Sequence, residues 1–173
     1  PVLYAWTGDI NLANQAAPIL RLYALGNALL ALSAFPYYLQ YAKGNLKYHL
    51  IGNIISVVIL IPAVVWAATH YGAVGAGWVW FLMQLIYLVF WVSYIHAKLE
   101  PNMNLIWFKT FIPSVVTVSV FVLLTTQWVE YSGSRSVILL KIITISLCSV
   151  FIAMLSSVRI LNIFKAKIYR RAI

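Results

Sequence analysis

Acidic side chains are nearly absent from this chain. Its 173 residues include three Asp and Glu residues, and each lies in a polar connector: Asp9, Glu100 and Glu130. No apolar stretch therefore contains the pair of carboxylates that general acid–base catalysis commonly uses. The single cysteine, Cys148, excludes a disulfide framework and a Cys/His metal pattern. From these absences we expect a protein that is not an enzyme, with no catalytic residues, no metal ion and no cofactor.

Charged residues of either sign are also scarce, at 9% of the chain, whereas soluble domains contain about 25%. Hydrophobic residues reach 64%, the mean hydropathy is +0.92, and long apolar stretches alternate with short polar connectors. The apolar stretches cover residues 16–42, 50–68, 73–95, 110–129 and 137–158. A helix rises about 1.5 Å per residue and needs roughly 20 residues to cross a hydrocarbon core of about 30 Å. The sequence therefore predicts an all-α, polytopic bundle of five membrane-spanning helices between residues 16 and 158.

Most Lys and Arg residues lie on one side of this predicted bundle, in the connectors at residues 41–49 and 96–109 and in the tail at residues 159–173. The N-terminal segment, residues 1–15, contains none. By the positive-inside rule, the basic connectors and the C-terminus are cytoplasmic and the N-terminal segment is external. The net charge of +9 therefore reflects membrane topology, and we expect no nucleic-acid partner. The tail fits either a helix lying on anionic membrane lipids or a basic stop-transfer segment.

Two cations, Arg21 and Lys141, interrupt otherwise apolar helices near their predicted outer ends. A charge within a spanning helix is a candidate functional residue, because the bilayer centre penalises it by about 2.5–3.5 kcal/mol. Snorkelling to the headgroups is the alternative, since each cation lies about one turn from its helix end. Ala24, Ala28 and Ala31 share the Arg21 face, so this face suits close packing or the border of a cavity.

Three amides lie within the apolar stretches, at Asn27, Asn53 and Gln84. Hydrogen bonds between helices are the usual explanation of such amides, and the lining of a hydrated pathway is the other. We therefore take Arg21, Lys141 and these amides as candidate residues of a substrate pathway.

Four stretches in the first hundred residues carry a resemblance to a known family: AWTGD at residues 5–9, PILRLYALGN at 18–27, FPYYLQYAKGNLK at 35–47 and YGAVGAGWVW at 71–80. They resemble the second half of bacterial polysaccharide (O-antigen) repeat-unit flippases, which belong to the multidrug/oligosaccharidyl-lipid/polysaccharide exporter superfamily. The resemblance extends over about residues 2–100, and the last two predicted helices are generic.

The resemblance implies a two-lobed transporter of the bacterial inner membrane, of which this chain is the C-terminal portion. Its partner would be the remaining N-terminal half of the same transporter, and a polysaccharide polymerase is a further candidate partner. Such a protein moves an undecaprenyl-diphosphate-linked oligosaccharide from the inner to the outer leaflet by alternating access. Arg21 is the residue that we assign to the diphosphate, with Lys141 second.

Two other functions are compared with this expectation. A multidrug exporter of the same superfamily would bind cations and should carry acidic residues in its helices, and the apolar stretches contain none. A non-transporting polymerase or assembly subunit would be expected to carry a large external loop with arginines, whereas the external connectors here are short. A membrane anchor or structural protein is the remaining alternative.

The predicted topology is testable by cysteine labelling in a Cys148→Ser background. Asn45→Cys lies in a cytoplasmic connector, so an impermeant thiol reagent should label it only after the membrane is permeabilised. Ser134→Cys, in a connector predicted to be external, should be labelled in intact cells. Labelling of Asn45→Cys from the outside would show that the orientation is reversed.

Overall fold

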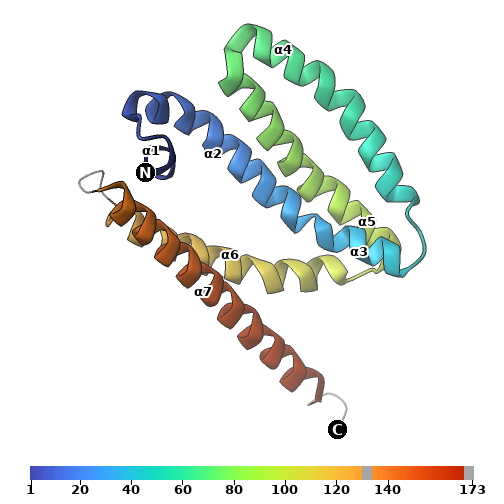
Figure 1. Cartoon of the computed structure of the whole chain (residues 1–173). Coiled ribbons are helices and arrows are strands. Elements are labelled where there is room, and N and C mark those ends of the chain that lie inside the picture. Colours follow the sequence, from blue (N-terminus) through green and yellow to red (C-terminus); the bar gives the residue numbers. More distant parts are fainter. Residues whose placement is uncertain (130–133, 170–173) are drawn as a thin grey trace. The chain divides into compact units, whose positions relative to one another are not determined.

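The computed structural model describes residues 1–129 and 134–169, with side chains described as far as Ser156. All regular secondary structure in these residues is helical, so the predicted all-α class is confirmed. The elements are α1 (Val2–Thr7), α2 (Ile10–Leu32), α3 (Ala34–Ala42), α4 (Lys47–Ile86), the π-helix η1 (Tyr87–Trp91), α5 (Val92–Leu99), α6 (Met103–Thr126) and α7 (Arg135–Tyr169) (Figure 1).

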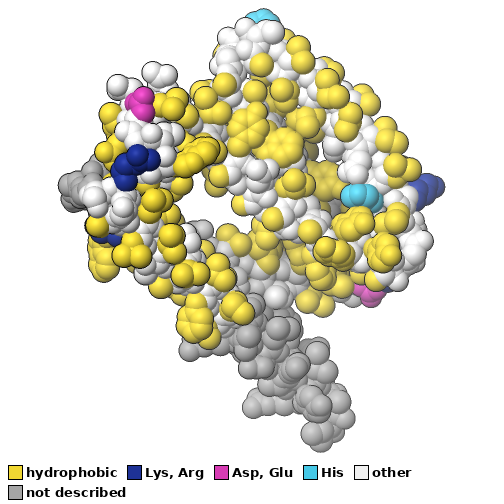
Figure 2. Space-filling model, viewed as in Figure 1, with side chains coloured by type: hydrophobic (Ala, Val, Ile, Leu, Met, Phe, Trp, Pro, Cys, Tyr) yellow, Lys and Arg dark blue, Asp and Glu magenta, His cyan; other side chains and the backbone are white. Residues whose placement is uncertain are grey.

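Four helical segments in the described residues are long and apolar enough to cross a membrane: Ile10–Ala42, Lys47–Leu99, Met103–Thr126 and Arg135–Ser156. Between 6% and 17% of the most apolar part of each segment is buried. Hydrophobic side chains accordingly cover much of the visible face of the helices (Figure 2). An apolar helix with so little of its surface buried is suited to contact lipid or further helices.

The stretches predicted as separate spans at residues 50–68 and 73–95 both lie in the segment Lys47–Leu99, and α4 reverses direction within it (Figure 1). The reversal is at Gly72, whose φ of 64° and ψ of −157° are not helical. This region of backbone conformation is essentially restricted to glycine. We call Lys47–Tyr71 and Ala73–Ile86 the first and second limbs of α4.

The two limbs, with η1 and α5 continuing the second, run antiparallel and make close contacts near both ends (Figure 1). Near the bend, a Cβ at Gly75 would lie 2.6 Å from the carbonyl oxygen of Ala67. At the far end, a Cβ at Gly52 would collide with the indole of Trp91. Small residues therefore let the backbones approach closely, which is the usual way that apolar helices associate in membranes.

The chain divides into two compact units, Asn14–Asn104 and a second one formed by Pro1–Ala13 with Leu105–Ile173. In the first unit, α2 packs on the second limb of α4. A Cβ at Gly26 would collide with Trp80, and one at Gly77 would lie 3.1 Å from the Cβ of Leu22. These contacts hold α2 against α4, and no hydrogen bond joins the two helices in the described residues.

The second unit joins α1 to α7. The Arg135 side chain donates from Nε to the carbonyl oxygen of Ala5 at 3.2 Å and from Nη2 to that of Trp6 at 2.7 Å. These carbonyls belong to the last turn of α1, where backbone acceptors lack helical partners. Ala5, Val129 and Ile138 form a small buried apolar cluster beside this contact.

Three helix boundaries differ from those predicted by more than four residues, and one of them is the start of α6, which is Met103 and not residue 110. The helix predicted to begin at residue 16 begins at Ile10, because Asp9 caps it: its Oδ1 accepts from the backbone N–H groups of Asn11 at 2.8 Å and Leu12 at 3.1 Å. The predicted boundary at residue 158 has no break in the backbone, because α7 continues to Tyr169. The pattern predicted for the tail depends on side chains outside the described residues.

A proline follows the interruption between α2 and α3. The helix pauses at Ser33, and Pro36 falls in the first turn of α3, where a backbone N–H has no helical acceptor in any case. Pro62 and Pro113, in contrast, lie inside α4 and α6 without interrupting them. The break at Ser33 therefore combines the missing N–H of Pro36 with a serine whose hydroxyl donates to the carbonyl oxygen of Leu29 at 3.2 Å.

Substitution of Gly72 should destabilise the α4 reversal. Gly72→Ala puts a Cβ into open space but forces an L-residue into a glycine-only conformation, so a loss of about 1–3 kcal/mol is expected. Denaturant unfolding of the purified protein in micelles would measure it. The neighbouring exposed substitution Ala73→Ser should change stability by no more than about 0.5 kcal/mol. Equal stability of Gly72→Ala and the wild type would contradict the assigned conformation.

Candidate functional site

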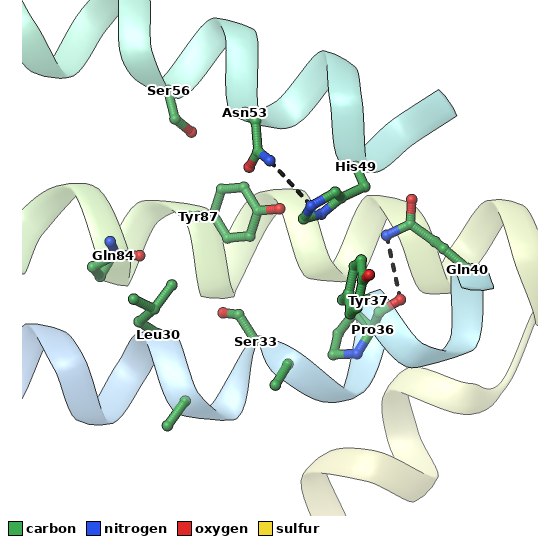
Figure 3. A pocket seen from close by; sticks show the side chains of 12 residues that line it. Leu30, Ser33, Pro36, Tyr37, Gln40, His49, Asn53, Ser56, Gln84 and Tyr87 are labelled. Carbon is green, nitrogen blue, oxygen red and sulfur yellow. Dashed lines mark hydrogen bonds between the residues drawn. The ribbon is translucent and has the colours of Figure 1, made fainter. Parts of the chain in front are cut away.

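A pocket of about 410 Å³ lies in the unit Asn14–Asn104, between α2, α3, both limbs of α4 and η1. We name it the amide pocket. Its polar and aromatic lining consists of Ser33, Tyr37, Gln40, His49, Asn53, Ser56, Gln84 and Tyr87, and Figure 3 shows these side chains around the same space. The size falls within the roughly 300–1,000 Å³ of typical ligand pockets.

Helical periodicity explains how these side chains converge. His49, Asn53 and Ser56 are spaced by four and three residues, so they share one face of the first limb of α4. Gln84, on the second limb of α4, and Tyr87, at the start of η1, are three residues apart and share one face of this continuous helix. The reversal at Gly72 brings these two faces to the same pocket.

The contacts inside the amide pocket are few. The Nδ2 of Asn53 lies 3.1 Å from the Nε2 of His49, so the ring nitrogen accepts when the amide donates. The ring of His49 packs against that of Tyr37, with 4.7 Å between centroids. Gln40 is 1% exposed and donates from Nε2 to the carbonyl oxygen of Pro36 at 3.3 Å. Its Oε1 is buried without a hydrogen-bond partner in the described part of the chain.

The amide pocket has no strong charge of its own. None of its lining residues is Asp, Glu, Lys or Arg within the described ranges. It offers amides, hydroxyls and aromatic rings instead, so it is suited to hydrogen bonding with a neutral polar group.

The structure brings two of the predicted pathway residues together, Asn53 and Gln84, in the amide pocket. Asn27 and Arg21 lie on α2 with exposed side chains and do not line it. Ala24 and Ala28 are exposed like Arg21, whereas Ala31, further along the same predicted face, lines the amide pocket. Asn53 and Gln84 therefore line the amide pocket, and Asn27 and Arg21 lie outside it.

Lys141 belongs to the other unit, where its side chain binds a backbone carbonyl just after the C-terminus of α6. Its Nζ donates to the carbonyl oxygen of Trp128 at 3.2 Å, just beyond the C-terminus of α6. A cation is favoured there by the helix dipole. Lys141 also lines an apolar groove of about 550 Å³ together with Thr144 and Cys148, which follow it at helical spacing on α7.

His49, Gln40, Tyr37 and Tyr87 were not among the residues predicted from the sequence. His49 falls in the connector predicted at residues 41–49, outside the apolar stretches from which the candidate residues are taken. The signal that could have found it is its spacing of four residues from Asn53, one turn along the same helix face. Gln40 lies in α3, which begins after the break at Ser33. The sequence predicted one uninterrupted helix over residues 16–42 and therefore no break at Ser33.

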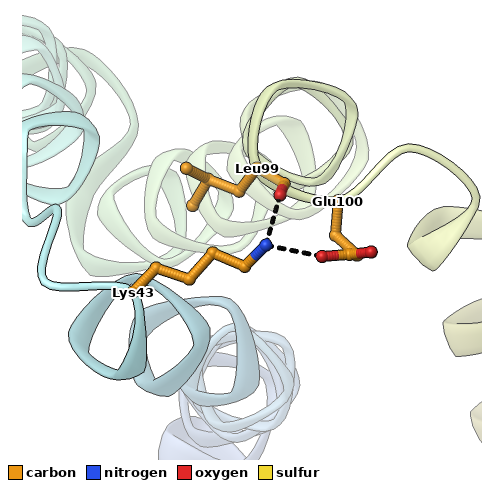
Figure 4. Close-up of polar contacts among 3 residues, drawn as sticks. All are labelled: Lys43, Leu99 and Glu100. Carbon is orange, nitrogen blue, oxygen red and sulfur yellow. Dashed lines mark hydrogen bonds and ion pairs between the residues drawn. The ribbon is translucent and has the colours of Figure 1, made fainter.

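An ion pair joins the ends of α3 and α5 near the amide pocket. The Nζ of Lys43 lies 2.5 Å from the Oε2 of Glu100 and donates to the carbonyl oxygen of Leu99 at 2.6 Å (Figure 4). Both side chains are substantially exposed, so water screens the pair. It ties the two connectors together, and its energetic contribution should be small.

A double-mutant cycle on Lys43→Ala and Glu100→Ala should measure a coupling of at most about 1 kcal/mol, as expected for an exposed pair. Lys43→Ala alone should cost more than Glu100→Ala, because it also removes the bond to Leu99. Unfolding of the four proteins in micelles would give the coupling. A value of several kcal/mol would contradict the screened geometry.

Comparisons of this chain with models of protein families, with curated proteins and with solved structures found no match.

Proposed function

We propose that this chain is part of a flippase of the bacterial inner membrane. It would move undecaprenyl-diphosphate-linked oligosaccharide repeat units from the inner to the outer leaflet for polysaccharide or O-antigen biosynthesis. The observation that carries the proposal is the amide pocket, a set of convergent amides and hydroxyls between helices that are long and apolar enough to span a membrane. Polar groups at such places are costly in lipid and are usually retained for function.

Two helix irregularities beside the amide pocket support a transport site. Ser33 marks the break between α2 and α3, and Tyr87 begins the π-helix η1, in which the N–H of Val92 donates to the carbonyl oxygen of Tyr87. Substrate sites in transporters are commonly formed by discontinuous helices, and π-helical turns are frequent at functional sites. Both irregular residues line the same pocket.

In this proposal the chain crosses the membrane five times, because Lys47–Leu99 crosses twice by reversing at Gly72. The N-terminal segment is external and the C-terminus cytoplasmic. The connectors that carry Lys43 and Lys98 are then cytoplasmic, and the amide pocket lies in the cytoplasmic half of the unit. This chain would form part of one lobe, with the N-terminal half of the same transporter as its partner.

Arg21 is the residue proposed to meet the diphosphate. Its side chain is exposed, and it has no hydrogen-bond or ion-pair partner within the described residues. It lies on α2 toward the proposed external end, so a substrate moving outward would pass the amide pocket first and Arg21 afterwards. An inside-negative membrane potential favours this movement of an anion, by about 2.3 kcal/mol per charge per 100 mV.

Substitutions of Arg21 test the proposal in cells whose surface polysaccharide depends on this protein. Arg21→Lys keeps the charge but loses the bidentate fork, so it should retain partial export. Arg21→Ala should lose most export while the protein accumulates normally. The control Lys47→Ala removes an exposed connector cation and should export as the wild type does.

The fate of the repeat unit separates the alternatives. A flippase defect leaves lipid-linked repeats in the inner leaflet, whereas loss of a polymerase subunit leaves single repeats at the surface. Wild-type export by Arg21→Ala at normal abundance would indicate a snorkelling arginine and remove the cation from the proposed pathway.

A further inference from the structure

We propose that the amide pocket binds an uncharged sugar ring of the transported molecule, and that it excludes the diphosphate and acidic sugars. This inference rests on the proposed transport function and assigns one part of the substrate to one place in the structure.

The hydrogen-bonding groups of the pocket are available for a ligand. The side chains of Ser56, Gln84 and Tyr87 line the pocket but make no hydrogen bond among the described residues. Asn53 bonds within its own helix, to His49. If these polar groups served to join the helices, they would be paired across the pocket, and in the described residues they are not. The arrangement therefore favours recognition of a ligand over helix association.

Gln40 supplies an independent sign of a missing donor. Its side chain is almost completely buried, its Nε2 is used by the carbonyl of Pro36, and its Oε1 has no partner within the described chain. A buried polar atom without a partner costs about 1–3 kcal/mol. Gln40 lines the amide pocket, but the Oε1 itself has almost no accessible surface, so a ligand hydroxyl reaches it only when the amide turns toward the pocket. Sugar hydroxyls both donate and accept, and amides do the same, so the two surfaces are complementary.

Aromatic rings supply the remaining wall. Tyr37 and His49 lie ring against ring, and Tyr87 faces the same space from η1 (Figure 3). A sugar ring has apolar C–H faces as well as hydroxyl edges. Its faces can pack on these rings while its edges meet Asn53 and Gln84, which is how ligand pockets usually combine apolar walls with a few polar groups.

The charge distribution decides which part of the substrate fits. No Lys or Arg lines the pocket in the described chain, and Lys43 near its end is paired with Glu100. A diphosphate or a uronic acid carboxylate would lose water there without gaining a counter-charge, which is strongly unfavourable. A neutral or N-acetylated sugar has no such penalty.

Binding can be measured on the purified chain in lipid nanodiscs, with a neutral disaccharide (chitobiose), a uronic-acid disaccharide and inorganic diphosphate as probes. Saturation-transfer NMR should detect chitobiose, and diphosphate should not compete with it. Gln84→Leu and Asn53→Leu should each weaken chitobiose binding roughly three- to tenfold, as expected for loss of one hydrogen bond. The matched control is Asn27→Leu, which removes an amide outside the pocket and should leave binding unchanged.

A protection measurement gives a result that does not depend on these leucine variants folding. In a Cys148→Ser background, chitobiose should slow modification of Ser56→Cys by a permeant maleimide and should not affect Asn27→Cys. Failure of chitobiose to bind saturably, competition by diphosphate, or equal weakening by Asn27→Leu would each overturn the inference.

The outcomes also separate this inference from the proposed function. Saturable chitobiose binding combined with normal export in cells that lack this protein would preserve the sugar site and reject the transport proposal. Loss of export by Arg21→Ala without any sugar binding would do the reverse.

Discussion

The backbone reversal at Gly72 is the constraint on which the amide pocket depends. A φ of 64° with a ψ of −157° turns one long apolar segment into two antiparallel limbs. Without it, Gln84 and Tyr87 would continue away from Asn53 and Ser56 instead of returning beside them. Contact between the limbs then requires small residues at both ends, and Gly75 and Gly52 provide them. The contacts between the limbs and the amide pocket therefore both depend on one backbone conformation that glycine can adopt.

The division between neutral and cationic groups gives the unit Asn14–Asn104 two kinds of surface. Asn53, Gln84 and the hydroxyls form a pocket without formal charge, whereas Arg21 is exposed on α2 outside it. The substrate that we propose, a lipid-linked oligosaccharide, has the same two parts, a polar uncharged glycan and an anionic diphosphate. Charged and uncharged groups need different environments when water is removed, since an ion requires a counter-charge and a hydroxyl requires only hydrogen bonds. Placing them apart lets each be satisfied by its own partners.

The sequence predicted the helical class, because uniform hydrophobicity over about 20 residues leaves few alternatives to a helix. It also selected Asn53 and Gln84, because amides are rare in such stretches. It did not select His49 or Gln40, which lie near helix ends where polar residues are common. Periodicity shows which residues share a face of one helix, but it does not show which faces meet. Which faces meet is especially hard to predict for helices that are apolar enough to span a membrane, since a face toward lipid and a face toward another helix are both apolar.

Helix boundaries were harder to predict from the sequence than the helical class, for a related reason. Hydropathy places a span by its apolar residues, so the polar start of α2 at Asp9 was assigned to an external segment, although an aspartate cap extends the helix to Ile10. The break at Ser33 and the π-helix at Tyr87–Trp91 are local backbone changes that hydropathy does not register. Ser33 and Tyr87, which stand at these two changes, both line the amide pocket. The irregular parts of these helices therefore contribute to the site together with the regular ones.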